Sequence, residues 1–217
     1  MRNAAASAIP TKCLSAEHVC SVGYYGFGKH AQGQLEAICA VRPIKLAYIY
    51  SCSTEKLEAF TQRISKRLGV EVRTSEIQEE PASAADIVVT CTTSFEPVLF
   101  GDWLTKPGLV IGAGANHWNG RDLDESIIKK SVACRRDERE TAKKESGALL
   151  LAVHSGIVSW DQVENLADIV VKRRQVPKFD PSSILFASYG LALEDVAISN
   201  KVYELAKQKG LGRHIQI

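Results

Sequence analysis

The sequence of 217 residues has little of what marks membrane, secreted or metal-binding proteins. No apolar run approaches the roughly 18 residues of a membrane span, and the N-terminal stretch has no long apolar core of a signal peptide. The six cysteines form no CxxC pair, and no cysteine–histidine cluster has the spacing of a zinc site. We therefore expect a cytoplasmic protein with reduced thiols and no bound metal.

An excess of charge of either sign is also absent, since the formal net charge is +2. The short basic runs Arg135-Arg136 and Lys172-Arg173-Arg174 are interpreted as solvated faces of the molecule. The tryptophans form no series on which bases could stack. The sequence therefore favours neither a nucleic-acid partner nor a membrane partner.

What the sequence does contain is a regular alternation of short apolar runs with helical patterns. The predicted strands are 20–25, 45–51, 70–74, 87–93, 109–115 and 131–135, with a further short strand at 183–188. Helices are predicted over 29–41 and 53–69, the second with an N-cap signal at its start, and the chain is mainly helical from about residue 138. This alternation indicates an α/β fold with a Rossmann-like, doubly wound parallel sheet of about six strands, flanked by helices and reversed in order at the first strand.

We expect a single dinucleotide-binding domain over residues 1–217. The C-terminal helix, 189–209, is expected to pack back on the N-terminal helix, 2–14. Both carry apolar stripes, and the N-terminal helix otherwise lacks a partner.

The stretch Gly26-Phe27-Gly28-Lys29-His30-Ala31 fits the pattern G-x-G-x-x-A between a predicted strand and a predicted helix. Gly26 would make the tight turn, Gly28 would let the backbone approach a pyrophosphate, and Ala31 would keep the helix close to the sheet. The free N–H groups of the helix would face the phosphates. The alternative is a tight connection with incidental glycines, and we favour a site for NAD(P).

The residues after the second predicted strand bear on which nicotinamide cofactor is bound. An acidic residue there would favour NAD, and an arginine would favour NADP. The chain has Ser51, Ser53 and Thr54, with Lys56 close by and partly offset by Glu55. The absence of an acid at the tip gives a slight preference for NADP.

Four stretches together are similar to one protein family. They are RNAAASAIPTKCL near the N-terminus, GFGKHAQGQLEAICAVRPI, DIVVTCTTSFEPVLFGDWLTKPGLVIGAGANHWNGRDLD, and YGLALEDVAISNKVYELAKQKGLG near the C-terminus. In this order they resemble the ornithine cyclodeaminase/mu-crystallin family over nearly the whole chain. The resemblance implies an NAD(P)-dependent enzyme for a small amino or imino acid, which acts by cyclodeamination or as an amino-acid dehydrogenase or imine reductase.

The resemblance also implies a set of site residues. Arg2 matches an arginine that holds a substrate carboxylate, and Asn116 stands where the family has a catalytic aspartate. His117 could donate to a bound carbonyl or amine, although an exposed loop histidine is the alternative. Thr92 and Thr93 end the fourth predicted strand, where either cofactor contact or loop capping is expected. Cys52 stands where many relatives have an arginine for the cofactor phosphate. The expected cofactor-binding residues are Gly26, Phe27, Gly28, His30, Ala31, Ser51, Cys52, Ser53, Thr92, Thr93 and Gly114.

Two departures from the family pattern produce an alternative. Family members begin with a further N-terminal lobe, so residues 1–14 and 189–217 are interpreted as remnants of that second lobe and its connecting helices. An asparagine cannot serve as a general base. We therefore expect turnover at least about a thousandfold slower than in a full-length relative, and self-association or a homodimer through the uncovered surface. The alternative function is a non-catalytic NAD(P)-binding protein.

Overall fold

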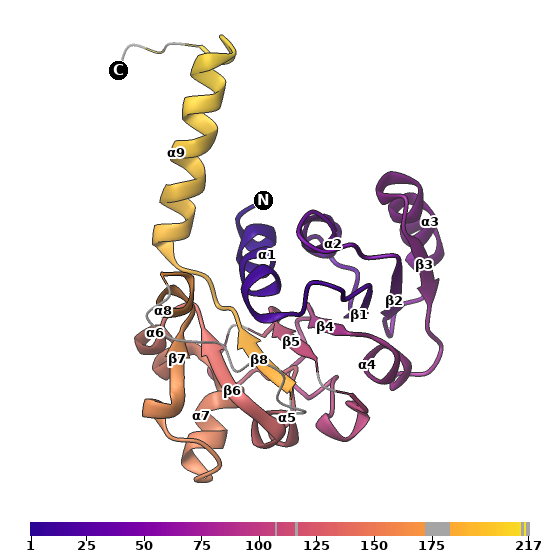
Figure 1. Cartoon of the computed structure of the whole chain (residues 1–217), viewed down its shortest axis with the longest axis vertical. Coiled ribbons are helices and arrows are strands. Elements are labelled where there is room, and N and C mark those ends of the chain that lie inside the picture. The colour runs from indigo at the N-terminus through magenta and orange to yellow at the C-terminus, as the bar shows by residue number, and fades with distance from the viewer. Residues whose placement is uncertain (107, 116, 172–182, 214, 216–217) are drawn as a thin grey trace.

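The computed structural model describes residues 1–106, 108–115, 117–171, 183–213 and 215, and only the backbone of residues 132–134 (Figure 1). Within these residues the chain forms one parallel sheet of eight strands. The strands are β1 (Ser21–Tyr25), β2 (Leu46–Tyr50), β3 (Glu71–Thr74), β4 (Ile87–Thr90), β5 (Leu109–Gly112), β6 (Ser131–Arg136), β7 (Val163–Asn165) and β8 (Ser183–Ala187).

The strand order is β3-β2-β1-β4-β5-β8-β6-β7, so the order reverses at β1 as predicted. The expected doubly wound parallel sheet is therefore confirmed, but it has eight strands rather than six. β8, predicted as a short strand at 183–188, lies between β5 and β6, and the strand that the sequence did not predict is β7 at the edge. β7 lies in a stretch predicted to be helical. Three residues are too few for a detectable period, and pairing with β6 decides their conformation.

Helices cover both faces of the sheet. The helices are α1 (Arg2–Leu14), α2 (Ala31–Cys39), α3 (Leu57–Leu68), α4 (Glu80–Ala84), α5 (Glu125–Lys130), α6 (Arg139–Glu145), α7 (Gly147–His154), α8 (Leu166–Val170) and α9 (Ala192–Gln208), with single 3₁₀ turns η1 (Gly101–Trp103) and η2 (Trp160–Gln162). One core contains apolar residues of α1, α2, α3 and α8, and the other contains residues of α4, α5 and α7. Figure 1 shows these two layers on opposite sides of the strands. None of the described helices is long and apolar enough to cross a membrane.

The helix predicted over 53–69 begins later, at Leu57. The predicted N-cap, Ser53, instead donates its backbone N–H to Ser51 Oγ at 3.2 Å, so these serines form a turn ahead of the helix. The helix ends as expected at Gly69, which adopts a left-handed φ of 66°.

The partner of α1 is α2 and not the C-terminal helix. Ser7 of α1 donates to the buried Gln34 Oε1 of α2 at 3.2 Å. Arg42, which follows α2, donates to the carbonyls of Lys12 and Ser15 at the end of α1. α2 and the residues that follow it therefore cover the side of α1 on which α9 was expected to pack.

The prediction that the C-terminal helix packs back on the N-terminal helix is confirmed only where the two helices begin. Arg2 forms ion pairs with Glu194 and Asp195, in the first turn of α9. Beyond this turn α9 projects away from the sheet, and none of its residues is buried (Figure 1).

Two arginines interpreted as a solvated face are in fact buried in β6. Arg135 is 2% exposed and Arg136 is 1% exposed. The reason is the position of β6 between β8 and β7, where both faces of a parallel strand are covered. Arg135 Nη2 forms an ion pair with Glu164 Oε2 of β7 at 2.9 Å. The other basic run, 172–174, lies outside the described residues.

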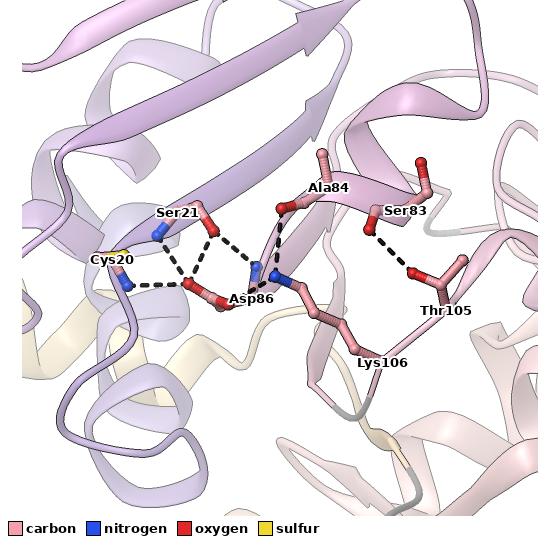
Figure 2. Close-up of polar contacts among 7 residues, drawn as sticks. All are labelled: Cys20, Ser21, Ser83, Ala84, Asp86, Thr105 and Lys106. Atoms are coloured by element: carbon pink, nitrogen blue, oxygen red, sulfur yellow. Dashed lines mark hydrogen bonds and ion pairs between the residues drawn. The ribbon is translucent and has the colours of Figure 1, made fainter.

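A polar cluster fixes the amino ends of β1 and β4, the edge of the sheet opposite the glycine turn (Figure 2). Asp86 Oδ2 accepts hydrogen bonds from the backbone N–H of Cys20 and Ser21, each at 3.0 Å, and from Ser21 Oγ at 2.7 Å. Lys106 Nζ lies 2.8 Å from Asp86 Oδ1. Burial alone would raise the pKa of Asp86, but the hydrogen bonds from Lys106, Cys20 and Ser21 outweigh it and lower the pKa to about 2.

We predict that Asp86→Asn lowers the free energy of unfolding by about 2 kcal/mol at pH 7. Because the folded pKa lies below the ordinary 3.8, this stabilisation is present above about pH 4 and disappears as the pH falls towards 2. Urea unfolding of both proteins at pH 7 and pH 2.5 measures it. Thr105→Val, which removes an exposed bond to Ser83 in the same region, is the control. A difference between wild type and Asp86→Asn that is equal at the two pH values would contradict the prediction.

Candidate functional site

The glycine turn after β1 is built around Gly26. Its backbone N–H donates to Tyr50 O at 2.9 Å, which extends the pairing of β1 with β2 by one residue. Gly26 has a φ of +91°, and a Cβ there would lie 2.8 Å from Cys91 O of the neighbouring chain segment. Both observations require glycine at this position.

The rest of the turn is anchored on one side and open on the other. Phe27 is half-buried and packs against Phe60 of α3 with ring centroids 5.7 Å apart. Ala31 is buried at the start of α2. Gly28, Lys29 and His30 are exposed. Gly28 lacks a positive φ, and a Cβ there would meet no described atom within 4 Å.

The open side of the turn has the chemistry of an anion site. His30 occupies the N-cap position of α2, and no side chain among the described residues caps it. The first turn of α2 contains no acidic residue. The Ala31 N–H donates to Gly28 O at 3.1 Å, so the N–H groups of the next two residues and the positive end of the helix dipole are the ones available to a phosphate. The residues present fit a pyrophosphate, since the protein gives no packing reason for a glycine at position 28.

The end of β2 lies beside this turn, because Gly26 is bonded to Tyr50. Ser51 is half-buried, while Cys52, Ser53 and Thr54 are exposed. The neutral hydroxyl groups at this tip can donate to a ribose or to a phosphate.

The ends of β4 and β5 complete the edge. Thr92 Oγ1 accepts a bond from the Ser94 N–H at 3.3 Å, and Thr93 is exposed. A Cβ on Gly26 would lie 3.2 Å from Thr92 Cγ2, and a Cβ on Gly114 would lie 2.5 Å from Thr92 O. Gly26, Thr92 and Gly114 are therefore brought together into one continuous rim at the carboxyl edge of the sheet.

Arg2 lies at the same edge, further along, beside the residues that follow β8. Its Nε is 3.1 Å from Asp195 Oδ1 and its Nη1 is 3.5 Å from Glu194 Oε2. A side chain on Gly190 would collide with the Arg2 guanidinium. Burial raises the pKa of Glu194 and so does Asp137, against the lowering effect of Arg2. These ion pairs join the start of α1 to the first turn of α9.

His117, which the sequence predicts for the substrate side, lies in the loop after β5. His117 is exposed, and its carbonyl accepts the Gly120 N–H at 3.0 Å. The backbone of this loop packs against Gly147 at the start of α7, which leaves no room for a side chain there. Asn116 lies outside the described residues.

Several polar residues at this edge were not singled out by the sequence. Asp122 is 5% exposed and accepts a hydrogen bond from Thr90 Oγ1 at 2.5 Å. The guanidinium of Arg136 lies 4.0 Å from the ring centroid of Tyr189, whose hydroxyl is 2.9 Å from Ser146 Oγ. Burial raises the pKa of Tyr189, although Arg136 and Ser146 act in the opposite direction.

One feature of the sequence could have indicated these residues as site candidates, namely their position after predicted strands. Asp122, Arg136 and Tyr189 each lie at or just beyond the end of a predicted strand or in its following loop, where ligands of parallel sheets bind. Among the described residues no group of three or more histidine, cysteine, aspartate or glutamate side chains is arranged to hold a metal ion.

Comparison with known proteins gives a consistent result. Residues 1–210 match the model of the ornithine cyclodeaminase/mu-crystallin family. A Delta(1)-pyrroline-2-carboxylate reductase of Bacillus cereus is 29% identical over 217 residues, which are all of this chain and 66% of that protein. The chain therefore spans just under two thirds of the length of this relative.

Two solved structures have the same fold over almost the whole chain. The Delta(1)-pyrroline-2-carboxylate reductase of Thermococcus litoralis, in complex with NADH and L-proline, is 31% identical with a TM-score of 0.94. An archaeal alanine dehydrogenase dimer with bound NAD is 28% identical with a TM-score of 0.90. In both cases the match covers 99% of this chain and 66% of the other.

Proposed function

Because the chain belongs to the ornithine cyclodeaminase/mu-crystallin family, we propose that it is an NAD(P)-dependent enzyme that acts on a small amino or imino acid. The reaction is cyclodeamination, amino-acid dehydrogenation or imine reduction. The observation that carries the proposal is the open, uncapped start of α2 beside Gly28, at the strand where the sheet order reverses. Ligands bind at such a reversal in open α/β sheets.

In this proposal the rim of the carboxyl edge holds the cofactor. The turn Gly26–Phe27–Gly28 and the first N–H groups of α2 bind the pyrophosphate, and His30 lies beside them. Ser51, Cys52 and Ser53 face the adenine ribose. Thr92, Thr93 and Gly114 lie towards the nicotinamide, whose bound ring supplies hydride transfer.

The substrate side is assigned to Arg2 and to the loop after β5. The Arg2 guanidinium can bind a carboxylate in two parallel hydrogen bonds, a geometry that lysine cannot reproduce. His117 is the ionisable side chain next to Asn116, and it is proposed to donate a proton to the carbonyl or amine. The pyrroline-2-carboxylate reductases and the alanine dehydrogenase to which the chain is similar are named for such small acids.

Three further assignments go with this function. We assign residues 1–14 and 189–217 to connecting helices of a second lobe, supported by the ion pairs that join Arg2 to α9. We also propose a homodimer or larger self-associate, which is supported by exposed apolar side chains on α9. Analytical sedimentation measures this state of association. These side chains are Leu193, Val196, Val202, Tyr203 and Leu205. The five described cysteines are free, which supports a cytoplasmic location.

A non-catalytic NAD(P)-binding protein is the second candidate. It is favoured by the ion pairs that already occupy Arg2, the proposed carboxylate ligand. The two candidates differ in turnover and share the cofactor site, so binding and catalysis have to be measured separately.

The first prediction is that NADH or NADPH binds in a saturable manner and that Gly28→Asp abolishes this binding. The added carboxylate would repel the pyrophosphate, while the open space at this position leaves the fold intact. Fluorescence titration measures binding, and thermal unfolding checks the fold. Asn200→Asp, at an exposed position of α9 away from the turn, is a control for added charge. The prediction fails if the folded wild-type chain binds neither nucleotide.

The second prediction concerns the choice of cofactor. We propose a preference for NADPH, supported by the neutral tip of β2 and by the exposed Lys56 at the start of α3. The dissociation constant for NADPH should be about two- to fivefold below that for NADH, as expected for one exposed charge pair. Lys56→Ala should remove this difference, and Lys66→Ala, on the same helix, should not. Tighter binding of NADH by wild type would contradict the preference.

The third prediction separates the two candidate functions. A steady-state assay of the chain with pyrroline-2-carboxylate, alanine and ornithine should give turnover with at least one of them. Arg2→Lys should raise KM for that substrate about tenfold with little change in kcat, because a bidentate contact is lost. Arg67→Lys, at an arginine paired with Glu36 on the outer surface, is the control. Saturable cofactor binding without turnover of any of the three would favour the non-catalytic candidate.

A further inference from the structure

The buried carboxylate of Asp122, in the connection between β5 and α5, lies against the end of β4 and the start of its own connection at the carboxyl edge of the sheet. Its Oδ2 accepts the Thr90 hydroxyl, from the last residue of β4, at 2.5 Å. The backbone of Gly114, in the loop after β5, lies directly against this carboxylate, and the N–H groups of Gly114 and Ala115 lower its pKa. One side chain therefore ties the end of β4 to the loop that follows β5.

The backbone of Asp122 is itself fixed to a third segment. Its carbonyl accepts the N–H of Val98 at 3.0 Å and of Leu99 at 3.1 Å. The next residue, Leu123, forms a parallel bridge with Leu99. Asp122 belongs to the same connection between β5 and α5 as Gly114 and Ala115, and these backbone bonds hold its later part against Val98 and Leu99.

Gly114 fills the space between this carboxylate and β4. A Cβ at Gly114 would lie 2.5 Å from Asp122 Oδ2 and 2.6 Å from Thr92 N. Thr92 in turn contacts the turn at Gly26. A contiguous series of contacts therefore runs from Asp122 through Gly114 and Thr92 to the proposed pyrophosphate site.

Burial is unfavourable for this carboxylate. It raises the pKa of Asp122, whereas the bonds from Thr90, Gly114 and Ala115 lower it. The titratable groups that Asp122 influences are Cys91 on the β4 side and Tyr189 on the β8 side, and Arg136 stacks on Tyr189. A buried carboxylate at the edge where ligands bind is more typical of a functional site than of a core.

We propose that Asp122 is a positioning residue for the cofactor: with Thr90 it holds Gly114 and Ala115 at the distance at which this loop contacts the nicotinamide half. This inference rests on the proposed function. The adenine half is assigned to β1 and β2, where the ribose of a dinucleotide binds. The loop after β5 lies across the point of strand reversal from β2, so it faces the other half of the molecule.

The experiment compares Thr90→Val with Thr90→Ser. Valine has the shape of threonine and removes the donor, whereas serine keeps it. Isothermal titration calorimetry is carried out with NADH and with ADP-ribose, which lacks the nicotinamide. Thr90→Val should weaken NADH binding about tenfold, the effect of losing one hydrogen bond to a charged group, and ADP-ribose binding less than about twofold. Thr90→Ser should bind both as wild type does.

Asp86→Asn is the matched structural control. Asp86 also binds two backbone N–H groups and a hydroxyl, but at the opposite edge of the sheet. It should lose stability and keep both affinities. Asp122→Asn is the second variant and should lose NADH affinity in the same direction as Thr90→Val, with the folded fraction measured by urea unfolding.

The outcomes separate this inference from the function on which it rests. If wild type binds ADP-ribose and NADH and Thr90→Val binds both as well as wild type does, the inference is wrong and the proposed function stands. Equal weakening of the two ligands would also overturn it, since a general loss of structure would explain that result. If the folded wild-type chain binds neither ligand, the proposed function fails and the inference fails with it.

Discussion

The close approach of the β1–α2 turn to the end of β4 is the constraint on which the site depends. With a Cβ at Gly26 only 2.8 Å from Cys91 O, the two chain segments touch backbone to backbone. The contact continues from Thr92 to Gly114, where again no side chain fits. Gly26 and Gly114 have no side chains at these contacts, so the segments that follow β1, β4 and β5 can approach closely. This approach brings the N-terminus of α2 to the rim that the three strands share. An anion placed there meets free N–H groups rather than packed side chains.

Much of this arrangement could be predicted from the sequence because the signals are local. β1, β2, β4 and β5 are apolar runs bounded by glycine, proline or hydroxyl residues, and their order follows from the rules for parallel sheets. Gly26 and Ala31 were predicted correctly in their packing roles, since the turn pattern specifies them. For the same reason the family could be identified before the structure, and the match over residues 1–210 confirms it.

What the sequence did not predict depends on contacts between distant residues. Arg135-Arg136 has the composition of a surface run, and only the placement of β6 between two strands buries it. β7 is too short to show a period, and pairing with β6 makes it a strand. The C-terminal helix carries apolar residues, but its expected partner, α1, is already packed on α2 through Ser7 and Gln34. Asp122 is separated from Thr90 by 32 residues, so no local pattern reveals that bond.

The partly buried Asp86 and the buried Asp122 show how the edges of the sheet differ physically. Hydrogen bonds and Lys106 lower the pKa of Asp86, so its charge stabilises the fold at neutral pH. Burial raises the pKa of Asp122, so the stability linked to it is greatest at low pH and is lost as the pH rises through that pKa. Ionised Asp86, at the amino edge, thus stabilises the fold. Ionised Asp122, at the carboxyl edge, lowers the free energy of unfolding. Burial disfavours the charge of Asp122, yet this carboxylate lies against the loop beside an open anion site. Such a charge fits a requirement of ligand binding rather than of folding.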